Sequence, residues 1–137
     1  MVENKITGSC LCGTVKYRIT GNLNKFYYCH CMQCRKITGS AHASNILTDP
    51  NNIEWVSGKN NIKRFDLPGN GKYVKNFCRT CGSGVPFINK SGDTLFIPAG
   101  SLDVDPRIRT TNNIFWDDRA LWYEEGLSAP RCVGFPE

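Results

Sequence analysis

Eight cysteines, seven of them in three short groups, constrain the fold of this 137-residue chain more than any other feature. The groups are Cys10-Leu11-Cys12, the run from Cys29 to Cys34, and Cys78-Arg79-Thr80-Cys81. We expect a cytoplasmic protein, because residues 1–10 contain no apolar stretch able to serve as a signal peptide. Thiols stay reduced in that compartment, so the groups favour metal ligation over disulfides.

The first and third groups together predict a closed zinc site. Side chains two apart on a strand point the same way, so Cys10 and Cys12, expected to open a strand, can face one ion. A disulfide between them is the alternative, but a short extended segment rarely supplies that geometry without strain. In the C-x-x-C-G knuckle, two intervening residues let Cys78 and Cys81 approach a tetrahedral ion, and Gly82 allows the tight exit. A redox C-x-x-C would require a βαβ setting, which is not visible here.

The middle group, Cys29-His30-Cys31-Met32-Gln33-Cys34, offers three thiolates and no obvious fourth ligand. Cys29 and Cys31 would share a strand face, and Cys34 would curl back after two residues. Three protein ligands with one open position are typical of catalytic zinc. Two alternatives stay open: a second structural site closed by Cys132 or a histidine, and a group of reduced thiols in a protein with one zinc. We expect His30 to point away from the metal and His42 to occupy an ordinary polar position.

The charge of the middle group indicates what it would bind. Zinc with three thiolates carries a net charge of −1, which makes it a weak Lewis acid better suited to a soft sulfur ligand than to ester or amide hydrolysis. A bound substrate thiolate would add another negative charge and would need nearby cations. Arg35 and Lys36 follow Cys34 directly and are candidates, although two solvated surface residues are an interpretation at least as good.

The net charge of +5 does not predict a nucleic-acid partner. The 17 basic residues are scattered without three in a row, and basic patches are the feature that such binding requires. If seven cysteines bound two zinc ions as thiolates, the chain would lose seven protons and gain four positive charges, so its net charge would fall by three. Hydrophobic residues at 40% and charged residues at 21% are typical of a globular protein, so we expect one domain over residues 1–137. No apolar run approaches the roughly 18 residues of a membrane span, and we expect no membrane association.

The distribution of apolar residues predicts a mainly β protein. Val15, Tyr17 and Ile19 alternate with polar residues, as in a strand with one wet face. Similar strands are expected over Phe26–Cys31, Ile53–Val56, Lys72–Phe77, Val85–Ile88 and Thr94–Pro98. Helical signals are weak. One turn is expected at Cys34–Thr38 and another at Pro106–Asn113, while Arg119–Gly126 is either helical or extended.

Four blocks of sequence carry a family resemblance. They are Gly8-Ser9-Cys10-Leu11-Cys12-Gly13, Cys29-His30-Cys31-x-x-Cys34-Arg35-Lys36-x-x-Gly39-Ser40, Phe77-Cys78-x-x-Cys81-Gly82 and Pro98-Ala99-Gly100-Ser101-Leu102-Asp103. In this order the chain, from about Gly8 to Tyr123, resembles the glutathione-dependent formaldehyde-activating family, which includes centromere-protein-V-like members. The resemblance implies a mainly β, Mss4-like fold of several small coiled antiparallel sheets stapled by zinc, with few short helical turns.

The resemblance also implies a function. In the name-giving members, the thiol of glutathione meets formaldehyde and gives S-hydroxymethylglutathione. Carried over, this predicts a carbon–sulfur lyase or synthase with a small thiol and a small carbonyl compound as partners and glutathione as the co-substrate. Two Zn²⁺ are implied, one structural on Cys10, Cys12, Cys78 and Cys81, and one labile and catalytic on Cys29, Cys31 and Cys34. Arg35, Gly39 and Ser40 are expected to shape the thiol pocket. The alternative hypothesis is a zinc-stabilised binding module that has lost the chemistry.

Three positions depart from the family pattern. Members often carry a His-Ile-Phe segment before a Ser-Arg/Lys-Ala-Pro-Trp block. Here Asn113 stands at the histidine, Asp118 at the serine and Leu121 at the proline. The expected zinc ligands are untouched, but we expect a different pocket wall. The identity of the thiol and the carbonyl compound, the direction of the reaction and the oligomeric state are not indicated by the sequence.

Overall fold

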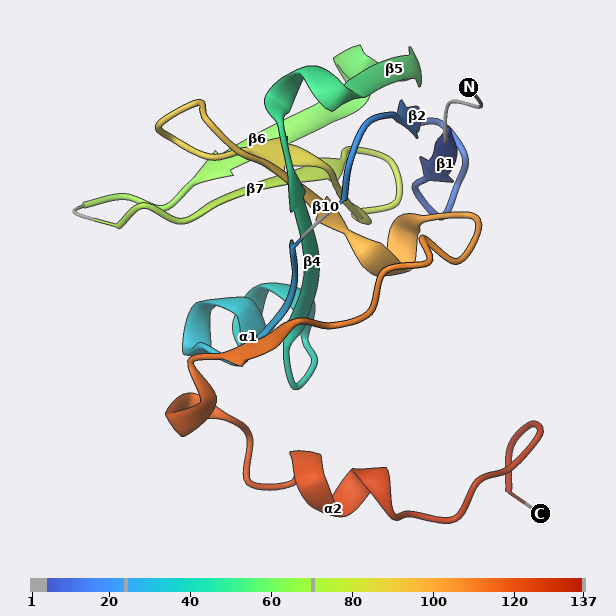
Figure 1. Ribbon diagram of the computed structural model, residues 1–137, viewed down its shortest axis with the longest axis vertical. Coiled ribbons are helices and arrows are strands. Elements are labelled where there is room, and N and C mark those ends of the chain that lie inside the picture. The colour runs from blue at the N-terminus through green and yellow to red at the C-terminus, as the bar shows by residue number, and fades with distance from the viewer. Residues whose placement is uncertain (1–4, 24, 70, 137) are drawn as a thin grey trace.

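The computed structural model describes residues 5–23, 25–69 and 71–136, and its strands form three small sheets (Figure 1). Part of the expectation about the N-terminus concerns residues 1–4, which lie outside the described residues. The first sheet is antiparallel, with the order β1 (Ile6–Ser9), β2 (Lys16–Ile19) and β5 (Ile53–Ser57). Another antiparallel sheet has the order β6 (Ile62–Asp66), β7 (Val74–Cys78) and β8 (Gly84–Val85).

The central sheet has five strands. Their order is β11 (Asn112–Ile114), β3 (Lys25–Cys29), β4 (Ala43–Thr48), β10 (Leu95–Pro98) and β9 (Phe87–Ile88). All of its pairs are antiparallel except β11 with β3, which is parallel. The expected mainly β fold of several small sheets is therefore confirmed, with one parallel pair added at an edge.

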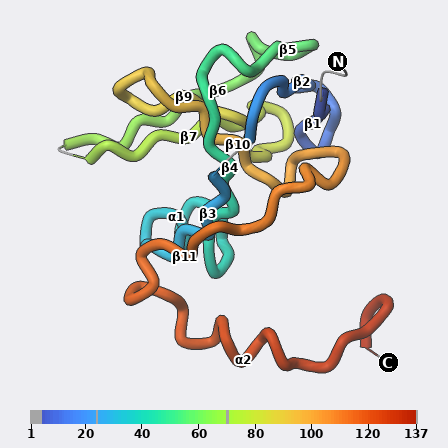
Figure 2. Tube along the Cα trace, viewed as in Figure 1, coloured from blue at the N-terminus to red at the C-terminus, as the bar shows by residue number. Residues whose placement is uncertain are grey.

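Helices are short in the part of the chain that the structure describes. α1 (Met32–Thr38) follows β3, and α2 (Tyr123–Leu127) follows β11. Single 3₁₀ turns cover Pro50–Asn52, Lys59–Asn61, Ala99–Ser101 and Trp116–Asp118. After β11 the chain leaves the sheets, and α2 lies at the far end of the molecule from β1 and β5 (Figure 2). No helix formed by the described residues combines the length and the hydrophobicity that a membrane crossing requires.

The main core lies between the first sheet and one face of the central sheet. Tyr17 and Ile19 of β2 are almost fully buried, as their alternation in the sequence predicts. They form one cluster with Phe26 of β3, Ile46 of β4, and Leu95 and Ile97 of β10. Burial of these apolar side chains is the main force that holds the two sheets together.

At one end of this core, the backbone of Gly8 lies directly against the ring of Tyr17. A Cβ placed on Gly8 would lie 2.3 Å from Cζ of Tyr17, so only glycine fits there. The Tyr17 hydroxyl is hydrogen-bonded to Ser101, whose own hydroxyl donates to the carbonyl of Pro98 at 2.6 Å. Two of the family-like blocks, around Gly8 and around Ser101, thus meet at one tyrosine.

One expectation about local structure was wrong, and one strand was not predicted. No helical turn forms at Pro106–Asn113, because the backbone of this segment binds the edge of β3: Thr111 donates its amide to the carbonyl of Phe26 at 2.7 Å, and β11 begins at the next residue. The sequence also gave no expectation for β4. Its alternation is hidden because apolar side chains project from both faces of the central sheet, Ile46 on one side and Leu47 on the other.

Candidate metal centres

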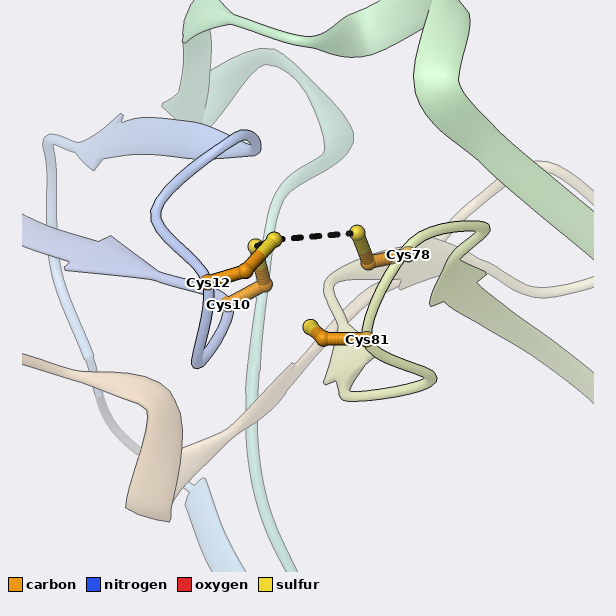
Figure 3. A group of neighbouring side chains, drawn as sticks. All are labelled: Cys10, Cys12, Cys78 and Cys81. Carbon is orange, nitrogen blue, oxygen red and sulfur yellow. Dashed lines mark hydrogen bonds between the residues drawn. The ribbon is translucent and has the colours of Figure 1, made fainter.

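Four cysteines from two turns converge between the first sheet and the sheet formed by β6, β7 and β8 (Figure 3). Cys10 and Cys12 come from the turn that joins β1 to β2, and Cys78 and Cys81 come from the end of β7 and the turn after it. All four Sγ atoms lie within 4.8 Å of one another. The Sγ atoms of Cys10 and Cys12 are 3.6 Å apart, and those of Cys12 and Cys78 are 3.8 Å apart. A tetrahedral zinc ion with Zn–S bonds of about 2.3 Å requires sulfur separations of about 3.8 Å, so this donor set fits zinc.

The first pair of sulfurs is aligned by a turn, which corrects the expectation of a strand. Cys10 donates its amide to the carbonyl of Val15 at 3.0 Å, and Gly13, at a φ of 81°, donates to the carbonyl of Cys10 at 3.2 Å. Strand alternation therefore plays no part in bringing Cys10 and Cys12 together. The Val15 amide also donates to Sγ of Cys10 at 3.2 Å, a contact that stabilises a thiolate.

The knuckle has the expected form. Gly82 adopts a φ of 77° and donates its amide to the carbonyl of Cys78 at 2.8 Å. Nδ2 of Asn61 donates to Sγ of Cys78 at 3.5 Å. Hydrogen bonding to Ser83 lowers the pKa of the Cys81 thiol to about 5, while burial raises the pKa of Cys10. The turns therefore supply donors that favour thiolates, the form in which cysteine binds metal.

Three cysteines form the second cluster, at one end of the central sheet. Cys29 is the last residue of β3, Cys31 is the N-cap of α1, and Cys34 lies in the first turn of that helix. Their Sγ atoms lie within 4.8 Å of one another, and Sγ of Cys31 accepts a hydrogen bond from the Cys34 amide at 3.4 Å. Among the described residues, no further histidine, cysteine or carboxylate joins this group.

The thiols of this cluster share their protons. Hydrogen bonding to Cys34 lowers the pKa of Cys29, and the same interaction, together with burial, raises the pKa of Cys34. Without an ion, the cluster therefore retains a proton on Cys34. A metal ion would displace it, because metal ligation requires the thiolate. The donor set of three soft sulfurs fits zinc with one position left for another ligand.

Both histidines lie away from the thiolates. His30 is fully buried, and its Nε2 lies 2.9 Å from Oδ1 of Asn113 on β11. Its ring centroid is 5.0 Å from those of Trp116 and Tyr123. His42 stacks on Tyr28 at 4.2 Å and belongs to the same aromatic group. Cys132 is exposed near the C-terminus and belongs to neither cluster. The histidines and Cys132 therefore do not close the three-cysteine cluster.

A cavity of about 410 Å³ opens beside the three cysteines. Its lining consists of Tyr27, Cys29, Cys31, Gln33, Cys34, Asn45, Leu47, Lys72, Tyr73, Val74, Phe87, Asn89, Phe96, Ile114 and Phe115. The Tyr73 hydroxyl interacts with Cys34, and burial raises the pKa of Tyr73, so the hydroxyl stays protonated. A larger, more open cavity of about 720 Å³ is lined by Cys10 of the other cluster but by none of these three cysteines.

The structure does not bring the other predicted site residues to this cavity. Arg35 donates from Nη1 to the carbonyl of Asp118 at 3.0 Å, on the side of α1 facing the 3₁₀ turn. Gly39 ends α1 with a φ of 65°, and Ser40 donates its amide to Oγ1 of Thr38 at 3.2 Å. None of the three lines the cavity. The nearby cations are instead Lys72 in its lining and Lys75, whose charge interacts with Cys34.

The three departures from the family pattern also lie outside the lining of this cavity. Asn113 binds His30, Asp118 presents its carbonyl to Arg35, and Leu121 is 95% exposed. Tyr27, which does line the cavity, carried a signal that the sequence reasoning missed. It lies two residues before Cys29 on β3 and therefore shares its face.

The fold and the two clusters define a small β protein with two groups of cysteines able to hold metal ions. The chain belongs to the glutathione-dependent formaldehyde-activating enzyme family, whose model matches residues 5–118. A Halomonas elongata protein named "Putative glutathione-dependent formaldehyde-activating enzyme" is 27% identical over 140 residues, covering 96% of this chain and 89% of its own length. A crystal structure of a Rhodobacter sphaeroides protein has a similar fold, with a TM-score of 0.59 and 24% identity over 74% of this chain and 92% of that chain.

Proposed function

We propose that this chain is a zinc-dependent carbon–sulfur lyase or synthase that joins a thiol to a small aldehyde, or reverses that reaction. One observation carries the proposal: three cysteine Sγ atoms converge without a fourth protein ligand among the described residues, and they do so at the wall of a cavity. Membership of the family supports glutathione as the thiol and formaldehyde as the reference aldehyde.

The two clusters would hold zinc in different roles. Cys10, Cys12, Cys78 and Cys81 supply four donors and would hold a structural ion that ties turns of two sheets together. Cys29, Cys31 and Cys34 supply three donors and would hold the catalytic ion. That ion, when bound, would offer a position to the substrate sulfur and keep it as a thiolate. Because it lacks a fourth protein ligand, we expect it to be the more easily lost of the two.

The reaction is a simple addition. The thiol sulfur bonds to the aldehyde carbon, the carbon–oxygen π bond breaks, and the thiol proton ends on the oxygen. The cavity wall beside the cysteines positions the aldehyde carbon against the sulfur and restricts access of water. The Tyr73 hydroxyl, protonated and next to Cys34, would donate a hydrogen bond to the carbonyl oxygen as negative charge develops there. Lys72, exposed in the cavity lining, would pair with a carboxylate of the thiol.

Metal stoichiometry tests the proposed metal roles directly. We expect elemental analysis to find two zinc ions per chain in the wild type and one in Cys34→Ser. Cys132→Ser, which changes an exposed thiol outside both clusters, should keep two and is the matched control. Glutathione should slow the removal of the labile ion by a chelator in the wild type and in Cys132→Ser, which both hold that ion. One zinc in all three proteins, indifferent to glutathione, would instead leave a zinc-stabilised binding module.

The chemistry is tested by exchange between free and bound aldehyde. Thiols add to formaldehyde without a catalyst, so the readout is the acceleration of this exchange, measured by NMR at equilibrium with glutathione. We expect acceleration by the wild type and by Cys132→Ser, none by Cys34→Ser, and a loss of at least tenfold in Tyr73→Phe, because one hydrogen bond to a developing oxyanion is worth at least that. Equal rates for the wild type and Cys34→Ser would refute the lyase proposal.

A further inference from the structure

We infer that the cavity beside the three-cysteine cluster binds an apolar carbon group of the aldehyde, so that the preferred aldehyde is aromatic or branched aliphatic and larger than formaldehyde. The inference rests on the proposed function and specifies its substrate. The reaction is unchanged: sulfur bonds to the carbonyl carbon, and the thiol proton moves to the oxygen. Only the group attached to that carbon differs.

The floor of the cavity is one face of the central sheet. Phe26, Ile46 and Leu95 point into the main core from β3, β4 and β10. Their neighbours in the sequence point to the opposite face, because side chains alternate along a strand. Those neighbours are Tyr27, Leu47 and Phe96, and all three line the cavity. The strand register places Leu47 opposite Phe96 and Phe96 opposite Phe87, which makes the floor continuous across three strands.

This face has an unusual composition for its position. An antiparallel sheet that packs one face on a core commonly shows polar side chains on the other. Here Phe96 and Phe87 stack with their ring centroids 5.1 Å apart and their planes within 6° of parallel. Tyr27, Leu47 and Phe96 each remain partly accessible. An accessible apolar surface of this kind marks a binding site.

The cavity is much larger than formaldehyde. A molecule with two heavy atoms needs a few tens of Å³, comparable to the ~30 Å³ share of one water molecule. The cavity measures about 410 Å³, which lies within the range of about 300–1,000 Å³ found for pockets that hold drug-sized ligands. Formaldehyde alone would leave most of the apolar floor in contact with water.

The position of the sulfur ligands decides which part of the adduct lies on the floor. Cys29 shares the face of β3 with Tyr27, so the cluster forms one end of the floor. A carbon bonded to the substrate sulfur would therefore extend over the apolar residues. Among the lining residues Lys72 is the only one with a charged side chain, apart from the thiols. Glutathione, with two carboxylates and an ammonium group, does not suit such a floor, and the aldehyde-derived group does.

The test compares aldehydes with the zinc-loaded full chain and glutathione. We expect kcat/KM for phenylacetaldehyde and for 3-methylbutanal to exceed that for formaldehyde at least tenfold, since even one methylene in an apolar pocket is worth about tenfold or more. Leu47→Trp would fill the cavity, and its ratio of phenylacetaldehyde to formaldehyde kcat/KM should fall at least tenfold. Phe96→Ala instead removes an apolar side chain from the floor and should lower the same ratio. Val56→Trp, at a half-exposed position of β5, is the control and should leave the ratio unchanged.

A binding measurement separates this inference from the proposed function. The unreactive probe 2-phenylethanol should cause saturable NMR shifts at the amides of Leu47 and Phe96 in the wild type and none in Leu47→Trp. Turnover with a preference for formaldehyde, unaffected by Leu47→Trp, overturns the inference and keeps the proposed function. No turnover of any aldehyde overturns the proposed function. In that case the probe tests the cavity by itself. Saturable binding of 2-phenylethanol would support an apolar ligand in the cavity, and the absence of binding would overturn the inference as well.

Discussion

The two cysteine clusters present the same donor atom in different numbers and from different parts of the chain. The four-cysteine cluster draws its ligands from two sheets, with Cys12 and Cys78 separated by 66 positions. The three-cysteine cluster takes all of its ligands from one short segment, the end of β3 and the first turn of α1. Both clusters consist of cysteines, so the residue type does not distinguish them. What differs is the number of donors and their surroundings: four sulfurs can complete the coordination of a zinc ion, whereas three leave a position for a substrate.

The surroundings of the two cysteine clusters also differ. The turns of the four-cysteine cluster are tied by backbone hydrogen bonds and lie next to the tightly packed contact of Gly8 with Tyr17. The three-cysteine cluster lines an accessible cavity, and His30, which lies between two of its cysteines in the sequence, belongs to a buried aromatic group. Four experiments test the roles of the residues in and around these two clusters.

Cys78→Ser should have the largest effect. It removes a fully buried ligand, and structural zinc contributes on the order of 10 kcal/mol to the folding of small domains, so we expect loss of the cooperative unfolding transition measured by circular dichroism. Cys34→Ser is the matched change in the other cluster and should retain that transition. If Cys34→Ser proved the more destabilising of the two, our assignment of the clusters would be reversed.

Gly8→Ala should lower the free energy of unfolding by about 1–3 kcal/mol, because the added Cβ would overlap the Tyr17 ring and force the first sheet to shift. Urea unfolding of the zinc-loaded protein measures this. Gly100→Ala is the control, because its Cβ would meet no heavy atom within 4 Å. Equal midpoints for the two variants would show that the contact at Gly8 is not tight in solution.

Asn113→Ala should cost about 1–2 kcal/mol, since it removes the hydrogen-bond partner of a fully buried histidine. We expect this change to act on the three-cysteine side of the molecule and to hasten zinc loss to a chelator from that cluster. Asn112→Ala, one residue earlier on β11 and exposed, provides the comparison. Identical zinc release from both variants would argue that His30 does not support the cysteines.

The last effect concerns pH and Tyr17 and is confined to alkaline solution. Burial raises the pKa of Tyr17 to about 12, against about 10 in an unfolded chain. Below pH 10 both states are protonated, and between about pH 10 and pH 12 only the unfolded chain loses the proton. Stability should therefore fall as the pH rises through that window. Urea midpoints measured across the window should fall less steeply in Tyr17→Phe, and identical slopes would contradict the assignment.

Sequence patterns predicted a strand with one solvent-exposed face, and they predicted which cysteines lie together. The alternation of Val15, Tyr17 and Ile19 predicted β2, and cysteine spacing predicted the two groups that the structure brings together. The strand and the spacing within each cysteine pair depend on short-range geometry, whereas the joining of Cys10 and Cys12 to the remote Cys78 and Cys81 followed from the four ligands that a structural zinc ion requires. The alignment of Cys10 with Cys12 was predicted for the wrong reason, because a glycine-containing turn was taken for a strand.

The cavity could not be predicted from local patterns. Its floor is assembled from β3, β4, β10 and β9, and nothing in the sequence around Phe87 or Phe96 indicates that they meet. Apolar residues on both faces also remove the alternation that identifies a strand, which is why β4 was missed. Arg35 follows a ligand in sequence, yet the helix rotates it towards Asp118 and away from the cavity.

The difference in sequence span also has a consequence during synthesis. The three-cysteine ligand set is complete once Cys34 has left the ribosome, whereas the other set requires Cys81, 47 residues later. Ligands close together in the chain also meet quickly, while joining remote ones costs more loop-closure entropy. If both clusters bind zinc as proposed, a nascent chain would therefore capture its first ion at the cluster with three ligands, which would hold it less firmly. The second ion, arriving last, would be the one that commits the chain to its fold.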